Sequence, residues 1–407
     1  MNNKTYHSPF NIAVLAAGLG FFIDAFDLFL FNVYRIPSLK ELGLTGTELT
    51  RVGEWLLSVQ MLGMMVGGIL SGVIADKKGR VTVMFGSILL YSVSNLANGF
   101  VNDVTTYAII RFFAGVGLAG ELGAGITLVG ESMSIKQRGY GTIFVATLGA
   151  LGAITAGLSG AFLPWREAFI VAGIAGFLLL FVRVKSMESS LFESVKQKSA
   201  SKGSLVLLLS DKKRMAKYLA CIAMGVPIWY SVGLLITLSP ELAELHNISG
   251  LKLSVCFILF QCGIASGDLS SGLISQWLKS RKWVIFGFMM LGVLATIFHF
   301  SRIFHGYDLS VTSFLMGLGC GYLSVFVTTT AEHFGTNLRV TVTATVTNFM
   351  RGAVTLLIPF HQWIEKQVEW SLSTGLAVTG MLVWTLAIIS VVSLPETYGK
   401  SMDYLEE

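Results

Sequence analysis

Charged residues are scarce in this sequence. Only 13% of its 407 residues are Asp, Glu, Lys or Arg, about half the share expected of a soluble globular protein. This scarcity excludes an ordinary soluble enzyme and a disordered chain. The net charge of +5 is spread over short loops and does not gather into a basic patch, so we expect no nucleic-acid partner.

Cysteine is scarce as well, with only four residues in the whole chain. None stands at the spacing of a zinc site, and all lie inside apolar runs, where buried free thiols are the simplest interpretation. A disulfide-stapled secreted domain is therefore excluded. The sequence also lacks a Gly-x-x-x-x-Gly-Lys phosphate loop, so ATP is not expected as a direct energy source. We expect no cofactor and no bound metal. The cysteines are Cys221, Cys256, Cys262 and Cys320.

Long apolar runs are what the sequence has in abundance. Hydrophobic residues make up 53% of it, and it contains 44 glycines. A helix that crosses a membrane needs about 20 apolar residues, and runs of this length recur along the whole chain. The pattern predicts an all-α polytopic membrane protein. Twelve spans are predicted, at residues 10–34, 53–75, 81–101, 104–128, 140–162, 166–184, 215–238, 252–277, 283–304, 309–331, 340–360 and 371–394.

The longest polar stretch, residues 185–213, divides the spans into two groups of six. We therefore expect a six-helix bundle at 1–184, a basic and serine-rich cytoplasmic linker at 185–213, and a second six-helix bundle at 214–407. With both termini in the cytoplasm, most of the 29 Lys and Arg residues fall in cytoplasmic segments, as the positive-inside rule requires. The expected location is the lipid bilayer of a bacterial inner (plasma) membrane, and the expected state is a monomer.

An internal repeat supports two related halves. Glu131 and Arg138 follow the fourth span, and Glu332 and Arg339 follow the tenth at the same spacing, 201 residues later. Gly72 and Gly272 near the ends of the second and eighth spans differ by 200. Two matches at nearly one offset indicate a duplicated unit in parallel orientation, because six spans return the chain to its starting side.

Several motifs carry a resemblance to a known family. Residues 72–80 read Gly-Val-Ile-Ala-Asp-Lys-Lys-Gly-Arg between the second and third spans. Residues 111–121 combine an arginine, spaced glycines and a glutamate, and residues 395–399 read Pro-Glu-Thr-Tyr-Gly. With twelve spans and the repeat, the chain resembles the major facilitator superfamily over its whole length, in the branch of sugar porters, phosphate symporters and organic-acid symporters. This resemblance implies two pseudo-symmetric bundles that transport by alternating access, and no enzyme activity.

Opposite charges at the cytoplasmic helix ends form a predicted gate. Pairs of this kind could hold the two halves together on the inner side while the transporter faces outward. Each exposed pair contributes only about 0 to 1 kcal/mol, but several together bias a two-state equilibrium. The alternative is that they serve topology and helix capping. The predicted gate residues are Asp76, Arg80, Glu131, Arg138, Glu332 and Arg339.

Ionisable residues within the spans are costly and are functional candidates by default. The resemblance places Asp27 and Arg111 at positions that carry proton coupling in sugar porters. An aspartate beside an arginine stays ionised, and it takes up a proton if the arginine moves away. The alternative is a static ion pair. Asp24 lies one turn from Asp27 and could share its proton. Glu121 matches an acid of phosphate and organic-acid symporters, and Asp268 fits either coupling or a helix-packing hydrogen bond.

Arg351 is the main candidate for substrate binding. A guanidinium at mid-membrane depth suits a two-pronged grip on a carboxylate or phosphate, although pairing with a buried acid fits equally well. Asn348 lies on the same face of the same helix. Further candidates are Gln60, Gln261, Trp229 and Tyr230, for which packing or anchoring is the alternative.

The Gly-x-Gly-x-x-Gly of residues 115–120 imitates a dinucleotide-binding motif, but it stands inside an apolar run with no preceding strand. It therefore predicts a close-packing helix face.

Together these features predict a proton-coupled symporter that takes up a small polar metabolite, with an organic anion or amino-acid-like compound favoured. The alternatives are a proton-driven exporter and a sugar or phosphate symporter. A membrane sensor without transport is a further alternative from another class of protein.

Overall fold

Helices dominate the structure, a computed structural model that describes residues 12–78, 80–120, 138–187, 208, 210–304, 309–368 and 370–399. These residues contain no strand. Seven of the helical segments are long and apolar enough to cross a membrane, and two shorter apolar helices accompany them. The predicted class, an all-α polytopic membrane protein, is confirmed.

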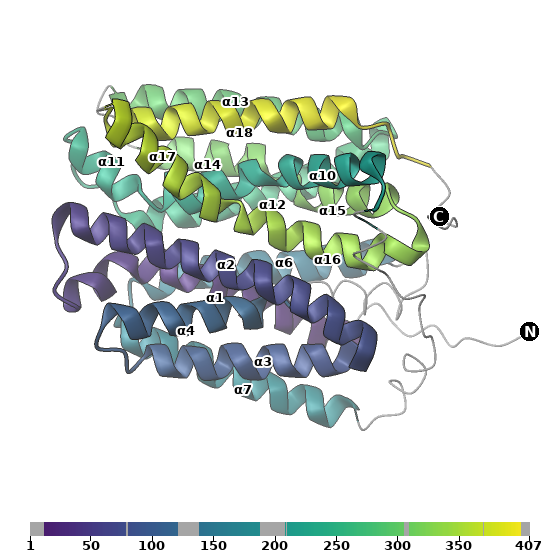
Figure 1. Cartoon of the computed structure of the whole chain (residues 1–407), viewed down its shortest axis with the longest axis horizontal. Coiled ribbons are helices and arrows are strands. Elements are labelled where there is room, and N and C mark those ends of the chain that lie inside the picture. The colour runs from purple at the N-terminus through teal and green to yellow at the C-terminus, as the bar shows by residue number, and fades with distance from the viewer. Residues whose placement is uncertain are drawn as a thin grey trace, which may run out of the picture.

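The first part of the chain forms six described helices, here called the N-terminal set. They lie together in the lower half of Figure 1, with α1 packed on α6 and α7, and α4 packed on α2 and α3. Each corresponds to one of the first six predicted spans. They are α1 (Ile12–Glu41), α2 (Gly46–Lys78), α3 (Arg80–Asn98), α4 (Val104–Leu118), α6 (Arg138–Ser159) and α7 (Trp165–Met187).

The remaining helices form the C-terminal set, in the upper half of Figure 1. Three of the last six predicted spans are interrupted here. The seventh is α10 continued by the π-helix η1, the tenth is divided into α14 and α15, and the eleventh into α16 and α17. The bounds are α10 (Lys212–Tyr230), η1 (Ser231–Ile236), α11 (Ser239–Leu245), α12 (Leu253–Leu278), α13 (Lys282–Phe304), α14 (Ser310–Cys320), α15 (Leu323–Glu332), α16 (Thr336–Gly352), α17 (Val354–Val368) and α18 (Leu372–Ser393).

Two groups of helices connect the two sets. In one, α2 packs against α16 and α17, and in the other α6 packs against α12. We call the end of the bundle at which α1 ends and α2 begins the outer end, at the left of Figure 1, and the opposite end the inner end. These names follow the predicted orientation, and the division into bundles at 1–184 and 214–407 likewise stays a prediction.

Glycines let neighbouring helices approach to backbone contact. A Cβ atom on Gly115 of α4 would lie 2.1 Å from the Gln60 carbonyl oxygen of α2, and one on Gly63 would lie 2.2 Å from the Phe112 oxygen. The C-terminal set has the same contact between α12 and α14, where a Cβ on Gly263 would lie 2.2 Å from the Phe314 oxygen. Gly117 meets the backbone of Tyr91 in α3, so the 115–120 motif is a packing face, as its apolar context predicts.

Gly115→Ala is expected to destabilise the protein by about 1 to 3 kcal/mol, the usual cost of forcing an extra methyl group into a packed contact. Its neighbour is backbone, which cannot rotate away. Gly86→Ala in α3 is the matched control, because nothing lies within 4 Å of its added Cβ. Thermal unfolding in detergent should show a lower midpoint for Gly115→Ala than for Gly86→Ala. Equal midpoints would contradict the close α2–α4 contact.

Candidate functional site

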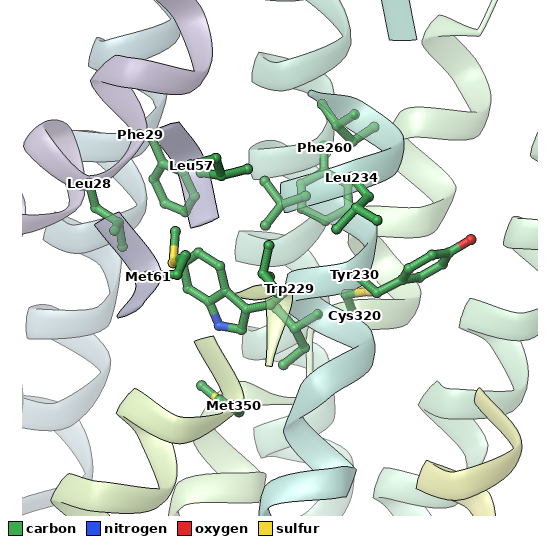
Figure 2. Close-up of a cluster of buried hydrophobic side chains, with 14 of the residues drawn as sticks. Leu28, Phe29, Leu57, Met61, Trp229, Tyr230, Leu234, Phe260, Cys320 and Met350 are labelled. Carbon is green, nitrogen blue, oxygen red and sulfur yellow. The ribbon is translucent and has the colours of Figure 1, made fainter. Parts of the chain in front are cut away.

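Trp229 of α10 lies between the two helix sets near the middle of the bundle. Its ring stacks on Phe29 of α1, with centroids 5.8 Å apart and an interplanar angle of 7°. Phe29 also meets Phe257 of α12 edge-on at 5.2 Å. Figure 2 shows Met61 of α2 beside the Trp229 ring and Met350 of α16 below it. Aromatic and thioether side chains from both sets therefore surround this position.

The Arg351 guanidinium faces the Trp229 ring at 5.3 Å. Arg351 is buried, and among the described residues its Nε has no hydrogen-bond partner. Asp24 of α1, also buried, acts on it electrostatically. The indole Nε1 of Trp229 likewise meets no acceptor among the described residues. A buried cation with an unused donor, next to an aromatic wall, can bind a planar anion through charge and hydrogen bonds.

Asn348, predicted to share the Arg351 site, forms contacts between helices. Its Nδ2 donates to the Ala119 carbonyl oxygen at 3.1 Å and to the Ala344 oxygen of its own helix at 3.0 Å. Gly68 of α2 leaves the room for it, since a Cβ there would lie 2.9 Å from Nδ2. Asn348 therefore joins α16 to the C-terminal end of α4, while its Oδ1 has no partner among the described residues.

Asp27 and Arg111 are both fully buried in the N-terminal set. They interact electrostatically, but the arginine directs its hydrogen bond to Gln60, from Nη2 to Oε1 at 2.6 Å. The Arg111 guanidinium also lies 4.9 Å from the ring centroid of Phe31. Neither carboxylate oxygen of Asp27 forms a well-oriented hydrogen bond with a described residue, and Asn95 of α3 lies beside it. This carboxylate therefore has unused proton-accepting capacity.

Three other predicted residues have different surroundings. Tyr230 donates to the Leu376 carbonyl oxygen at 2.7 Å, and Figure 2 shows its ring directed away from Trp229. Asp268 accepts from the backbone N–H of Ser324 at 2.7 Å and from its hydroxyl at 2.8 Å. It thereby caps the N-terminus of α15 where the tenth span is interrupted. Gln261 is buried with its Nε2 unpartnered among the described residues.

The predicted cytoplasmic gate is only partly visible. Its Glu131 lies outside the described residues, as does the proton-coupling candidate Glu121, and the side chains of Asp76, Arg80 and Arg138 are not described. Glu332 pairs with Arg281 at 3.5 Å and accepts from Thr397 at 2.7 Å. Arg339 donates to the carbonyl oxygens of Ala331 at 3.1 Å and Phe334 at 3.4 Å. These contacts all lie within the C-terminal set, and the gate across the two sets stays a prediction.

Glu396, from the 395–399 motif, secures the inner end of the C-terminal set. It accepts from the Ser280 hydroxyl and from the backbone N–H groups of Arg281 at 2.9 Å and Lys282 at 3.2 Å. Burial acts to raise the pKa of Glu396, but the hydrogen bonds outweigh it and hold this pKa at about 2. The ionised carboxylate therefore caps the start of α13 at neutral pH.

Sequence reasoning missed a row of polar contacts between the two sets at the outer end. Arg35 of α1 donates to the Thr237 carbonyl oxygen at 2.9 Å and pairs with Glu241 of α11. Asn32 donates to the Thr237 hydroxyl at 2.6 Å. Glu54 of α2 contacts the α17 residues described below. The sequence does show polar residues near the outer ends of the first and second spans, which could have indicated such contacts. Their partners could not be identified, because they lie hundreds of residues away.

Known proteins match the chain along its length. The Major Facilitator Superfamily profile matches residues 17–359. A Bacillus subtilis protein named for niacin and nicotinamide transport is 26% identical over 346 residues, which cover 82% of this chain and 84% of that protein. A Haemophilus influenzae protein named for metabolite transport is 25% identical over 414 residues, covering 96% of this chain and 97% of its own.

A solved structure supports the same fold. The crystal structure of a D-xylose–proton symporter superposes with a TM-score of 0.67 at 13% identity, covering 95% of this chain and 98% of that one. At this identity the match shows the fold alone. The family profile extends over most of the chain, and the homologues are transporters of small metabolites. The chain therefore belongs to the Major Facilitator Superfamily and is a membrane transporter, not an enzyme.

Proposed function

We propose that this chain is a proton-coupled symporter that takes up a small organic anion by alternating access. One observation carries the proposal: Arg351 is buried against Trp229 between the two helix sets, with Nε unused among the described residues. Retaining a buried guanidinium is costly unless an anion compensates it. Asp24 supplies part of that compensation in this conformation, and an incoming carboxylate would compete with it for the guanidinium.

The aromatic surroundings favour a substrate with a flat ring. Phe29 and Trp229 supply stacked faces beside the cation. The Bacillus relative is named for niacin and nicotinamide, and niacin combines a pyridine ring with a carboxylate. A small aromatic carboxylate therefore suits the charge and the aromatic character of these residues better than a neutral sugar does. Gln60, Gln261 and Asn348 remain candidates for further polar contacts to such a substrate.

Proton coupling is assigned to Asp27, with Arg111 acting on it electrostatically and Gln60 accepting the hydrogen bond of Arg111. The Asp27 carboxylate is fully buried with accepting capacity unused, and the Arg111 bond to Gln60 leaves the guanidinium within electrostatic range. A movement of α4 relative to α1 would change that interaction and hence the affinity of Asp27 for a proton. The bundles 1–184 and 214–407, joined by 185–213 and with both termini cytoplasmic, are the proposed moving bodies in a bacterial inner membrane.

Transport in proteoliposomes tests the function. A thermal-shift comparison of aromatic carboxylates with their neutral amides first selects the probe, since a ligand that binds only the folded state raises its apparent stability. With niacin as the starting probe, an inside-alkaline pH gradient should drive accumulation that a protonophore abolishes, while nicotinamide should not accumulate. Accumulation of the amide to the same level would contradict the anion assignment. Accumulation only under the reversed gradient would indicate an exporter.

A further inference from the structure

A histidine at the outer end bridges the two helix sets. His361 of α17 has a fully buried side chain, and its Nε2 lies 3.0 Å from Oε1 of Glu54 in α2. Its Nδ1 lies 2.9 Å from Oε1 of Glu365, one turn further along α17. Gln362 donates to the other Glu54 oxygen at 2.5 Å. Glu54 itself is only 4% exposed, so water screens its contact with His361 little, whereas the Glu365 side chain is 29% exposed.

This geometry requires a proton that the isolated groups do not hold at neutral pH. A neutral imidazole carries one N–H and one lone pair. If the N–H points to Glu365, a lone pair on Nε2 would face the Glu54 oxygen at 3.0 Å, where two acceptors repel each other. The contact is favourable only if Nε2 is protonated or Glu54 carries the proton. In either case the cluster holds one proton more than it would with a neutral histidine and two ionised carboxylates. The contact between Nε2 and Glu54 is bent from ideal hydrogen-bond geometry.

Within the part of the chain that the structure describes, the charged groups that act on His361 are Glu54 and Glu365. Helix α18 packs on α17 through Gly375 and contains no titratable residue. Among the buried titratable residues of α10 and α16, Tyr230 is bonded to Leu376, and Arg351 faces Trp229. In α1, Arg35 packs against Gly53 but forms its ion pair with Glu241.

The proton also lies where the two sets must separate. The cluster joins α2 of the N-terminal set to α17 of the C-terminal set, and Thr355 adds a bond to the Ser58 carbonyl oxygen at 3.2 Å on the same pair of helices. We propose that His361, Glu54 and Glu365 form a proton-binding latch, separate from Asp27, that closes the outer end. Loss of the proton leaves two carboxylates and a lone pair in a buried contact, which favours separation of α2 from α17. Proton uptake is thereby linked to closure.

Distance measurement between spin labels tests the latch without any substrate. Thr47 at the start of α2 and Gln367 near the end of α17 are both exposed and suit cysteine labelling. In nanodiscs the short-distance population should dominate at about pH 6 and give way to a longer one towards about pH 10. The population ratio should change by up to about tenfold per pH unit, the limit for one linked proton.

Three variants separate a proton latch from a merely structural contact. His361→Gln should remove the pH response. Glu54→Gln should keep the short distance even at high pH, because an amide N–H can donate to a neutral imidazole. His246→Gln is the matched control, since His246 at the same end contacts Ser373 at 2.7 Å and should leave the response intact. A distance distribution that does not change with pH in the parent, or a normal pH response in His361→Gln, would overturn the proposal.

Discussion

Asp27→Asn should abolish proton-driven accumulation of substrate while exchange of substrate across the membrane persists. An amide cannot release a proton in this range of pH, so the carrier loses the group whose protonation follows its conformation. Exchange needs only alternating access of the loaded site. Among the described residues, Asp27 interacts with Arg111 and Asn95, whereas Arg351 interacts with Trp229 and Asp24. A one-unit pH gradient should drive up to about tenfold accumulation in the parent for one coupled proton, and none in the variant.

Counterflow and gradient-driven uptake in the same proteoliposome preparation check this result. The matched control is Asp103→Asn, because Asp103 caps α4 at the surface by accepting from the Thr106 N–H at 2.8 Å, and asparagine caps equally well. Unchanged accumulation in Asp27→Asn would remove Asp27 from coupling. Loss of both uptake and exchange would show that the residue is needed for folding or substrate binding, and the coupling assignment would then be wrong.

The helical architecture could be predicted because it depends on local composition. Apolar runs of spanning length determine where helices form. The bounds of α12 and α18 lie within a few residues of the predicted ones, and α1 extends about two turns beyond its predicted end. The interruptions could not be predicted in the same way. The break between Cys320 and Leu323 lies in a continuous apolar run, and it is stabilised by Asp268, a residue more than fifty positions away. Such a cap becomes visible only once α12 packs against α15.

The site was partly predictable for a related reason. Burial of charge follows from sequence, so Asp27, Arg111 and Arg351 were recognised as costly residues. The direction in which each side chain leaves its helix did not follow from the sequence. Trp229 and Tyr230 are adjacent in sequence, yet one helical step of about 100° directs Trp229 towards Phe29 and Tyr230 towards Leu376.

The outer-end contacts between the two sets were not predictable, because each of them joins residues far apart in the chain. Glu54 and His361 each resemble an interfacial polar residue when considered alone. Their chemistry appears only when α2 and α17 are placed side by side. The motifs of the sequence therefore predicted contacts between the two sets at the cytoplasmic end. The contacts at the outer end, which the structure describes, were not among those predictions.

Arg351→Lys should weaken binding of an aromatic carboxylate by about ten- to a hundredfold, which corresponds to roughly 1.4 to 3 kcal/mol. Lysine keeps the positive charge, but it lacks the planar group that covers the Trp229 ring and the paired N–H donors that fit a carboxylate. The loss should be specific to the anion, so the affinity for the neutral amide should change far less and the preference for the acid should shrink. Direct binding titration of the acid and its amide measures both effects.

Arg166→Lys is the informative control for that experiment. Arg166 covers the ring of Trp165 at 4.3 Å, closer than Arg351 covers Trp229, but it lies at the exposed outer end and pairs with Glu41. The two substitutions remove the same kind of cation–aromatic contact, one at the surface and one buried between the helix sets. If only Arg351→Lys weakens acid binding, the guanidinium contacts the substrate. Equal acid affinity in the parent and in Arg351→Lys would mean that the charge of Arg351 serves Asp24 and not the substrate, and that this arginine has a structural role.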